Sequence, residues 1–331
     1  MLTLQQHPDN VFICYLVEGK KKQKIWWHPR KDLKLRMSVD SLDAFNTERF
    51  RDRFKISKNQ ADEIISNIKN KTTPEGGIQS RFFKVKKYLD TALFTEMDVR
   101  GSKQKIVVDY PEGNKTWGEL ELCCGSSGQG KTWYLSSKCQ RCLDGCAKNR
   151  RKILWVSNEF NIDKTLQTLK KPKYSQWFRG LDVSEESFEA CPHDTPQQFF
   201  DSEVKPIIGM LEPGDLCIFD DAADTPIRKQ LRFLITKMLR TCRHRGVGVA
   251  YILHRIKSGL WSQQASSSCK YYTVFPKSMK GKITEFIKEQ GLTTKDARRV
   301  VSDFGDCESR HMIVRLHAPT CFINNEMLRL F

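Results

Sequence analysis

The chain has 331 residues, with 56 basic and 39 acidic side chains, so its formal net charge is +17. Hydrophobic residues make up 39% and aromatic residues 10%, which is enough for a sizeable core and excludes a wholly disordered chain. The longest apolar run, about eight residues from Gly246 to Leu253, is far shorter than the roughly 20 residues of a membrane span. The positive charge favours a polyanionic partner such as nucleic acid over a merely soluble basic surface.

The start of the chain and its cysteines indicate a cellular compartment. Met1–His7 lacks the basic segment and apolar stretch of a signal peptide, so we expect no secretion by that route. The 12 cysteines show no disulfide-framework spacing, which favours reduced thiols in a cytosolic or nuclear environment.

Residues 1–77 are predicted to form a basic, α-rich N-terminal extension whose charge favours DNA as a partner. Helices are expected over about 40–53 and from Ser57, which with Gln60 resembles a capping box. The break at Thr73–Gly77 is the expected domain boundary. The basic residues of this segment include Lys20, Lys21, Lys22, Lys24, Arg30, Lys31, Lys34 and Arg36, with Trp26 and Trp27 among them.

Residues 78–331 are predicted to form one domain of the α/β class. Strands are expected at 105–109, 119–124, 152–157, 215–220, 247–253 and 271–275, with a late pair at 312–316 and 321–323. Helices are expected at 131–148, 196–211, 226–242, 283–290 and 294–301. This alternation predicts a mostly parallel sheet covered by helices on both faces.

The strongest motif fits the phosphate-loop pattern G-x-x-x-x-G-K-[ST]. It consists of Gly125, Ser126, Ser127, Gly128, Gln129, Gly130, Lys131 and Thr132, and it lies between a predicted strand and a predicted helix. Glycines let the backbone wrap a phosphate chain, and the helix start adds its positive dipole end. Lys131 is expected to contact the β- and γ-phosphates, and the Thr132 hydroxyl to bind Mg²⁺.

Two acids, Asp220 and Asp221, end the apolar strand 215–220. In a parallel sheet with a phosphate loop such a strand lies beside the loop, so we assign Asp220 to Mg²⁺ and Asp221 to the attacking water. Adjacent acids favour nucleotide hydrolysis. The chain lacks the guanine-reading N-K-x-D tetrapeptide, so ATP is preferred over GTP.

His254 follows the strand 247–253 and is predicted to point toward the γ-phosphate, because ligands bind at the carboxyl ends of such strands. The preceding helix has a basic face that is either solvated or turned toward DNA or another subunit. Cys139, Cys142 and Cys146 could suggest a metal site, but no fourth ligand is in view, and their helical spacing favours core-facing cysteines.

Several motifs follow one another in a characteristic order along the second part of the chain. They are Gly125–Thr132, Ser157–Asp163, Ile218–Asp221, Arg243–His244, Tyr251–His254, Tyr272–Pro276, Lys288–Leu292 and Ser309–Val314. Together they resemble the packaging ATPases of eukaryotic double-stranded DNA viruses, in the FtsK–HerA branch of P-loop motors, with RecA-like ASCE architecture. The likeness covers roughly residues 80–331 and is nearest to the virophage and Polinton type.

The resemblance implies an ATP- and Mg²⁺-dependent homo-oligomeric ring that moves double-stranded DNA into a preformed capsid. It implies contact with capsid protein and a location in the host cytoplasm or nucleus at viral assembly sites, or in the virion. It also implies an arginine finger from the neighbouring subunit, which falls on Arg243, with Arg245 and Arg240 as alternatives. The competing functions are a related translocase or helicase in replication or transfer, and a nucleotide-regulated DNA-binding scaffold protein.

Overall fold

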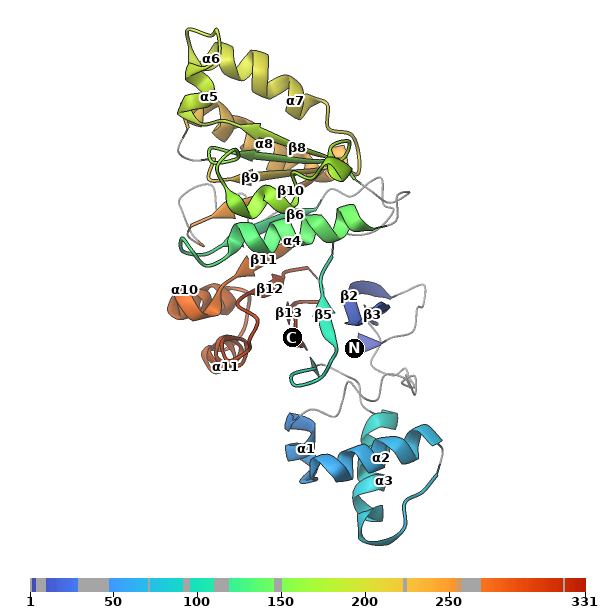
Figure 1. Ribbon diagram of the computed structural model, residues 1–331. Helices are drawn as coiled ribbons and strands as arrows, with labels where there is room; N and C mark the ends of the chain where they lie inside the picture. Colours follow the sequence, from blue (N-terminus) through green and yellow to red (C-terminus); the bar gives the residue numbers. More distant parts are fainter. Residues whose placement is uncertain are drawn as a thin grey trace. The chain divides into compact units, whose positions relative to one another are not determined.

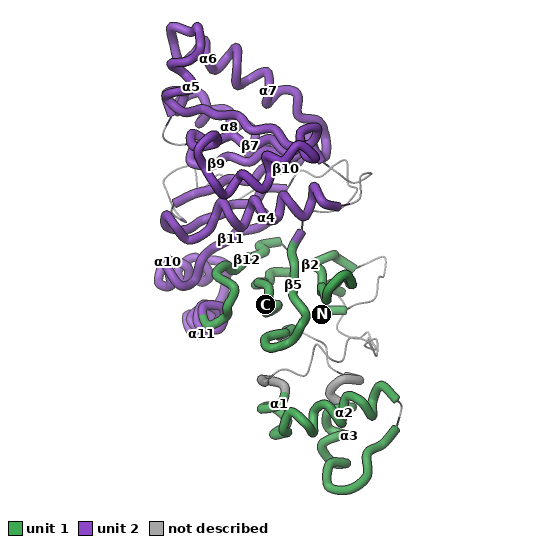
Figure 2. The backbone as a smooth tube through the Cα atoms, viewed as in Figure 1, with its two compact units in different colours: residues 1–108, 306–331 green, residues 109–305 purple. Residues whose placement is uncertain are grey.

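The computed structural model describes residues 2–3, 10–28, 48–70, 72–91, 96–109, 119–145, 151–222, 225–254, 256, 269–317 and 319–331. Cys146, the basic residues 30–36 and the first part of the helix expected at 40–53 lie outside these ranges. The chain divides into two compact units, residues 1–108 with 306–331 and residues 109–305 (Figure 2).

A parallel sheet forms the centre of the unit 109–305. Its strands lie in the order β11 (Tyr271–Val274), β6 (Leu120–Cys124), β10 (Gly248–Leu253), β9 (Leu216–Asp220), β7 (Ile153–Ser157) and β8 (Phe178–Asp182). Each neighbouring pair runs parallel. Every residue of β6, β7, β9 and β10 is buried, as expected for strands that are covered on both faces.

Helices on the two faces connect these strands. α4 (Lys131–Asp144) leads from β6 toward β7, and α8 (Arg228–Arg245) leads back from β9 to β10. The two connections cross the sheet in opposite directions, so right-handed crossovers place α4 and α8 on opposite faces (Figure 1). The other α-helices among the described residues of this unit are α5 (Glu185–Glu189), α6 (Pro196–Phe199), α7 (Lys205–Gly209), α10 (Pro276–Glu289) and α11 (Thr294–Gly305), with a π-helical turn at Phe200–Val204.

A buried polar network fastens α4 to the sheet. Lys138 Nζ lies 2.7 Å from Glu121 Oε2, and both side chains are almost fully buried. Thr273 of β11 donates to Glu121 Oε1 at 3.0 Å, and the Tyr134 hydroxyl donates to the same oxygen at 3.3 Å. Because a buried charge needs its partner, this network fixes α4 against both β6 and β11.

The unit 1–108 with 306–331 contains antiparallel strands and short helices. One sheet has the order β1 (Leu2–Thr3), β3 (Lys21–Trp27), β2 (Val11–Glu18) and β5 (Lys105–Val107). Antiparallel pairs also join β12 (Met312–Arg315), β13 (Cys321–Ile323), β14 (Met327–Leu330) and β4 (Glu96–Asp98). The helices are α1 (Glu48–Phe54), α2 (Lys58–Asn70) and α3 (Gln79–Thr91).

The expected α/β class with a mostly parallel sheet is confirmed. The predicted capping box before α2 is also present, because Ser57 and Gln60 each accept from the other's backbone N–H, at 3.2 and 3.0 Å. All five of the expected helices differ in extent. The one at 131–148 ends at Asp144, and the one at 196–211 is interrupted by the π-helical turn and ends at Gly209. The one at 226–242 runs to Arg245, the one at 283–290 begins at Pro276, and the one at 294–301 continues to Gly305.

The N-terminal region differs from the α-rich extension that the sequence indicated. It begins with the short strand β1 and the β2–β3 hairpin, and the compact units divide after Val108 and after Gly305 rather than near residue 77. The reason is pairing between distant segments. β2 pairs with β5, and β14 pairs with β4, so residues 96–107 belong with both chain ends.

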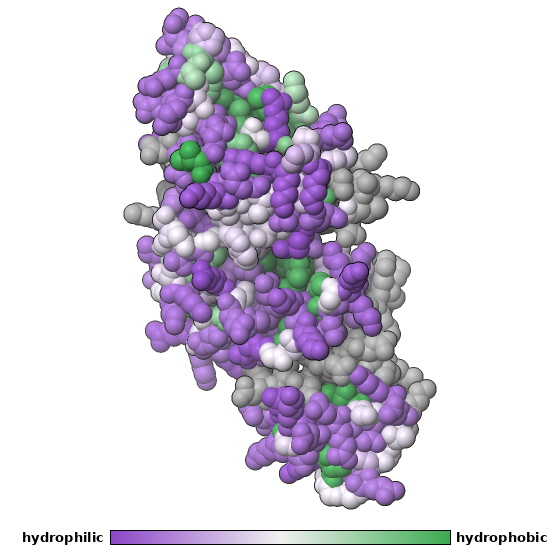
Figure 3. All heavy atoms as spheres, in the orientation of Figure 1, coloured by the Kyte–Doolittle hydropathy of each residue, from purple (hydrophilic) through white to green (hydrophobic). Residues whose placement is uncertain are grey.

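The face of the molecule in Figure 3 is largely hydrophilic, with small hydrophobic areas. Within the described ranges, none of the helices combines the length and the apolar character that crossing a lipid bilayer requires.

Candidate nucleotide-binding site

The loop between β6 and α4 has a backbone that only glycine accommodates easily. Gly128 and Gly130 have φ angles of +74° and +93°, in the left-handed region that favours glycine. A Cβ at Gly125 would lie 2.8 Å from Cδ2 of Phe275, so a larger residue would clash there. The Gly125 N–H donates to the Leu253 carbonyl at 3.0 Å, which ties the loop to the end of β10.

Lys131 points back into this loop. Its ammonium donates to the Ser126 carbonyl oxygen at 3.0 Å, and only 7% of the residue is exposed. Ser126, Ser127 and Gly128 are exposed. The cation therefore lies inside the turn of the loop, where backbone N–H groups and a helix start would surround an anion.

Thr132 and Asp220 meet although their strands are not neighbours. β10 lies between β6 and β9, yet the Thr132 hydroxyl donates to Asp220 Oδ2 at 3.0 Å. Burial raises the pKa of Asp220 to about 7, and the charge of Asp221 adds to this shift. A hydroxyl and a carboxylate are ligands that suit Mg²⁺, which uses few protein ligands and completes its shell with phosphates and water. A bound divalent cation would return Asp220 to its charged form.

Asp221 has an unusual backbone conformation and a close partner. Its φ of +45° is rare for a residue other than glycine, and such strain typically costs about 1–3 kcal/mol. Its Oδ1 lies 2.5 Å from Nε2 of His254, the residue that follows β10. Both side chains are partly exposed, so the pair is accessible from the carboxyl edge of the sheet.

A cavity of about 350 Å³ adjoins the loop, lined by Ser126, His254 and the first turns of α10 from Ser278 to Lys282. α10 has a kink here, because Met279 takes the non-helical angles φ −140° and ψ 33°. Lys280 and Lys282 are exposed and bring positive charge to this side of the loop. These lysines could not be identified from the sequence, because only the pairing of β11 with β6 places α10 beside the loop.

Two arginines at the start of α8 also lie near this edge. Burial raises the pKa of Tyr251 to about 12, and the charge of Asp221 adds to this shift. The positive charges of Arg228 and Arg232 act on the same hydroxyl in the opposite direction, so both arginines lie near it. From the sequence, both arginines are predicted only as part of the basic face of the helix that became α8. Their placement adds positive charge close to the Asp221–His254 pair.

Arg243 lies near the amino ends of the parallel strands, whereas the phosphate loop lies at their carboxyl ends. It is exposed in the last turn of α8, before β10 begins at Gly248, whereas His254 follows the end of β10. β10 has 6 residues, so roughly 20 Å of strand separates these ends. Arg240 and Arg245 are on the same last turns of α8, so none of the three reaches the phosphate loop of this chain.

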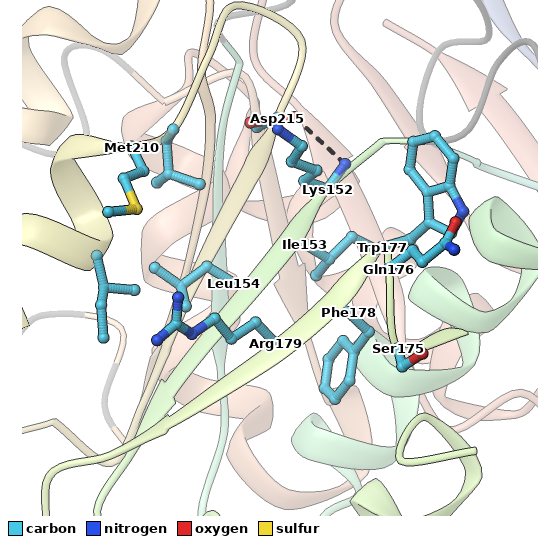
Figure 4. A pocket seen from close by; sticks show the side chains of 12 residues that line it. Lys152, Ile153, Leu154, Ser175, Gln176, Trp177, Phe178, Arg179, Met210 and Asp215 are labelled. Carbon is cyan, nitrogen blue, oxygen red and sulfur yellow. Dashed lines mark hydrogen bonds between the residues drawn. The ribbon is translucent and has the colours of Figure 1, made fainter. Parts of the chain in front are cut away.

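A second cavity, of about 250 Å³, lies at the amino ends of β7, β8 and β9, where Lys152, Trp177 and Asp215 line it (Figure 4). Asp215 accepts there from the backbone N–H groups of Lys152 and Glu212, at 3.2 and 2.9 Å. Its carboxylate thus links the segments that lead into β7 and β9. None of the site residues predicted from the sequence lines this cavity.

The cysteine motif shows no metal site within the described residues. Cys139 is fully buried, and burial raises the pKa of its thiol well above the ordinary value. In the described part of the chain, no group of three or more His, Cys, Asp or Glu side chains is arranged to hold a metal ion. Cys139 therefore packs as a core residue.

The strand order, the glycine-rich loop and the two carboxylates at the carboxyl edge of the sheet together define the fold. It is a P-loop nucleotide-binding fold. No protein-family model matches the chain, and no curated protein matches it.

Among solved structures, the chain is similar to the DNA-packaging ATPase B204 of Sulfolobus Turreted Icosahedral Virus, with 11% identity over 65% of this chain and 97% of that one, and a TM-score of 0.39. It is also similar to the cytoplasmic domain of the type VII secretion ATPase EccC of Thermomonospora curvata, with 10% identity over 70% and 28% of the two chains and a TM-score of 0.42. The pCW3 conjugation coupling protein TcpA is 12% identical over 65% of this chain and 61% of that one, with a TM-score of 0.38. These similarities are remote.

The raised pKa of Asp220 predicts a pH-dependent stability. With a folded-state pKa of about 7 against an ordinary value near 3.9, the folded protein holds a proton that the unfolded chain releases between these values. Stability contributed by this carboxyl is present below about pH 4 and is lost as pH rises through 7. Asp220→Asn should therefore be more stable than the parent above pH 7, by at most about 4 kcal/mol, with little difference below pH 4.

Thermal unfolding without metal or nucleotide, measured from pH 4 to 8.5, tests this prediction. Asp201→Asn is the control, because Asp201 is exposed and its pKa is lowered by Lys205. Identical pH profiles for the parent and Asp220→Asn would show that Asp220 is already ionised in the free protein.

Proposed function

We propose that this protein is an Mg²⁺-dependent ATPase that moves double-stranded DNA, and that the DNA is a viral genome entering a capsid. The observation that carries the hydrolytic part is the contact between Thr132 and Asp220, which joins the phosphate loop to a strand-end carboxylate. The net charge of +17 supports a polyanionic substrate. Packaging, rather than DNA transfer in replication or conjugation, rests on the resemblance of the ordered motifs.

In this proposal each residue at the loop has a distinct role. Lys131 neutralises charge on the β- and γ-phosphates, and Thr132 and Asp220 hold Mg²⁺. When bound, the metal polarises the phosphoryl oxygens. Asp221 orients the attacking water and accepts its proton, and His254 holds the Asp221 carboxylate in place through their 2.5 Å contact.

Lys131→Ala should lower DNA-stimulated ATP hydrolysis by at least about 100-fold, because it removes a charge that stabilises the transferring phosphoryl group. Phosphate release measured with and without double-stranded DNA tests this. Lys288→Ala is the control, because Lys288 is an exposed lysine on α10. Normal turnover in a folded Lys131→Ala variant would overturn the proposal.

Equilibrium binding of Mg·ATP, measured beside the same phosphate-release assay, separates the roles of the two carboxylates and the competing functions. Asp221→Asn should keep Mg·ATP binding and lose hydrolysis, whereas Asp220→Asn should weaken the metal-dependent binding itself. Equal loss of nucleotide binding in both variants would contradict this division of roles. Slow hydrolysis that DNA does not stimulate would favour a nucleotide-regulated scaffold protein instead.

Arg243 is proposed to complete the site of a neighbouring subunit in a ring, since it lies away from its own loop. An arginine supplied in this way can be worth roughly 10³ or more in rate. Mixing Arg243→Ala subunits with Lys131→Ala subunits should restore activity that neither variant has alone, because some interfaces then combine an intact loop with an intact arginine. Arg240→Ala is the control, and no rescue in confirmed mixed rings would indicate a structural arginine.

The β2–β3 hairpin is proposed to contact DNA phosphates. Lys20, Lys21 and Lys24 are exposed along the hairpin, and Trp26 is partly exposed beside them. Each lysine that neutralises a phosphate releases counterions, so the logarithm of DNA affinity falls with the logarithm of salt concentration by roughly 0.9 per contact. The alternative is a hairpin that docks on capsid protein.

Replacing Lys20, Lys21 and Lys24 by Gln should therefore reduce the salt slope of DNA binding by about 2–3 and leave basal ATP hydrolysis unchanged. The control replaces Lys171, Lys288 and Lys295, which are equally exposed in the other unit. An unchanged slope together with lost binding to capsid protein would assign the hairpin to docking.

A further inference from the structure

Trp133 is a large aromatic side chain that the fold leaves in solvent. It follows Thr132 in the first turn of α4, and 63% of it is exposed. Neighbours on the same helix, Tyr134 and Leu135, are buried in the core. Leaving a flat apolar ring in water forgoes the free energy of burying it, so this position suits an apolar ligand or partner.

The phosphate loop fixes where a nucleotide would leave it. In this motif the backbone N–H groups surround the α- and β-phosphates, and the lysine reaches toward the β- and γ-phosphates. Lys131 points back to Ser126, and Thr132 points to Asp220. The α-phosphate end of the chain therefore lies at the first turn of α4, and the nucleoside emerges beside Trp133.

A second exposed apolar side chain, Ile162, lies at the same end of α4. Its neighbour Asp163 acts electrostatically on Asp220, which places this loop at the carboxyl edge of the sheet. The following turn, Lys164–Thr168, packs on α4. Tyr174 and Lys173 then contact Asp144 in the last turn of α4, at 2.5 and 2.8 Å.

This segment thus follows α4 from its first turn to its last, with Ile162 at the beginning. Ile162 is 76% exposed. Two exposed apolar side chains from separate elements, Trp133 and Ile162, therefore lie at the end of α4 that carries the phosphate loop. Neither contributes to the core.

We propose that the base of the bound nucleoside triphosphate stacks on the Trp133 indole and that Ile162 forms the apolar wall of the same subsite. The inference rests on the proposed ATPase function, because the phosphate loop must hold the triphosphate. Stacking uses the π face that every base presents, so the subsite adds affinity without separating adenine from guanine. The competing occupant of this surface is a second copy of the chain.

Equilibrium binding of two ligands tests the subsite: Mg·ATP, which has a base, and Mg·tripolyphosphate, which has none. Trp133→Ala should weaken ATP binding roughly tenfold or more, because stacking on an aromatic side chain contributes about that much per base. Tripolyphosphate binding should change less than twofold. Trp133→Phe should retain most of the ATP affinity, and Ile162→Ser should lose part of it.

Phe233→Ala is the matched control, because Phe233 is an equally solvent-facing aromatic, 75% exposed, on α8. It should change neither affinity. Unchanged ATP binding by Trp133→Ala would overturn the subsite, and so would an equal loss of both ligands. A smaller oligomer with unchanged ATP affinity would also overturn it and would assign Trp133 to a subunit contact.

The Lys131→Ala variant keeps this result separate from the proposed function. It should weaken tripolyphosphate and ATP alike, because it removes a phosphate contact. If the parent binds neither ligand, the ATPase proposal fails and the subsite fails with it. If the parent binds both with equal affinity, the loop holds phosphates and the subsite alone is wrong.

Discussion

The parallel pairing of β6, β10 and β9 is the constraint on which the site depends. Leu253 lies opposite Cys124, and Tyr251 lies opposite Phe219, so the three strands end at nearly the same level. Each strand is then followed by a residue of the site. Parallel strands put their carboxyl ends on one edge, and ligands of open α/β sheets bind there. A shift of the register would separate the phosphate loop from Asp220 and Asp221.

At the carboxyl edge of the parallel sheet, two adjacent carboxyl groups lie close together in the free protein. Asp220 is buried and adjoins Asp221, which is why its pKa rises to about 7. Asp221 keeps a left-handed backbone and a short contact with His254. Strain and unmatched charge of this kind persist only where the surrounding packing enforces them, and they are typical of functional sites. A divalent cation and a polyphosphate would supply the missing charge pairing.

Rigid packing behind the loop keeps these groups in place. The Lys138–Glu121 pair and Thr273 lock α4 to β6 and β11, so the helix start that carries Lys131 cannot move independently. Phe275 closes over Gly125 from the other side. Positioning on rigid elements matters because phosphoryl transfer depends chiefly on the placement of charges.

The amino-acid pattern is enough to locate most strands of the central sheet and the chemistry of the phosphate loop, but not the β2–β3 hairpin or β8. Gly128, Gly130 and Lys131 were recognisable because a phosphate loop needs particular residue types at fixed spacing, and the strand that ends at Asp220 was recognisable from its apolar run. Which strands are neighbours is set in the folded molecule. The fold placed β10 between β6 and β9, brought His254 to Asp221, and set α10 beside the loop. It also paired β5 with β2, near the start of the chain, and β4 with β14, near its end. Pairing between distant segments depends on how whole elements bury one another's apolar faces, and no local pattern of residues records that choice.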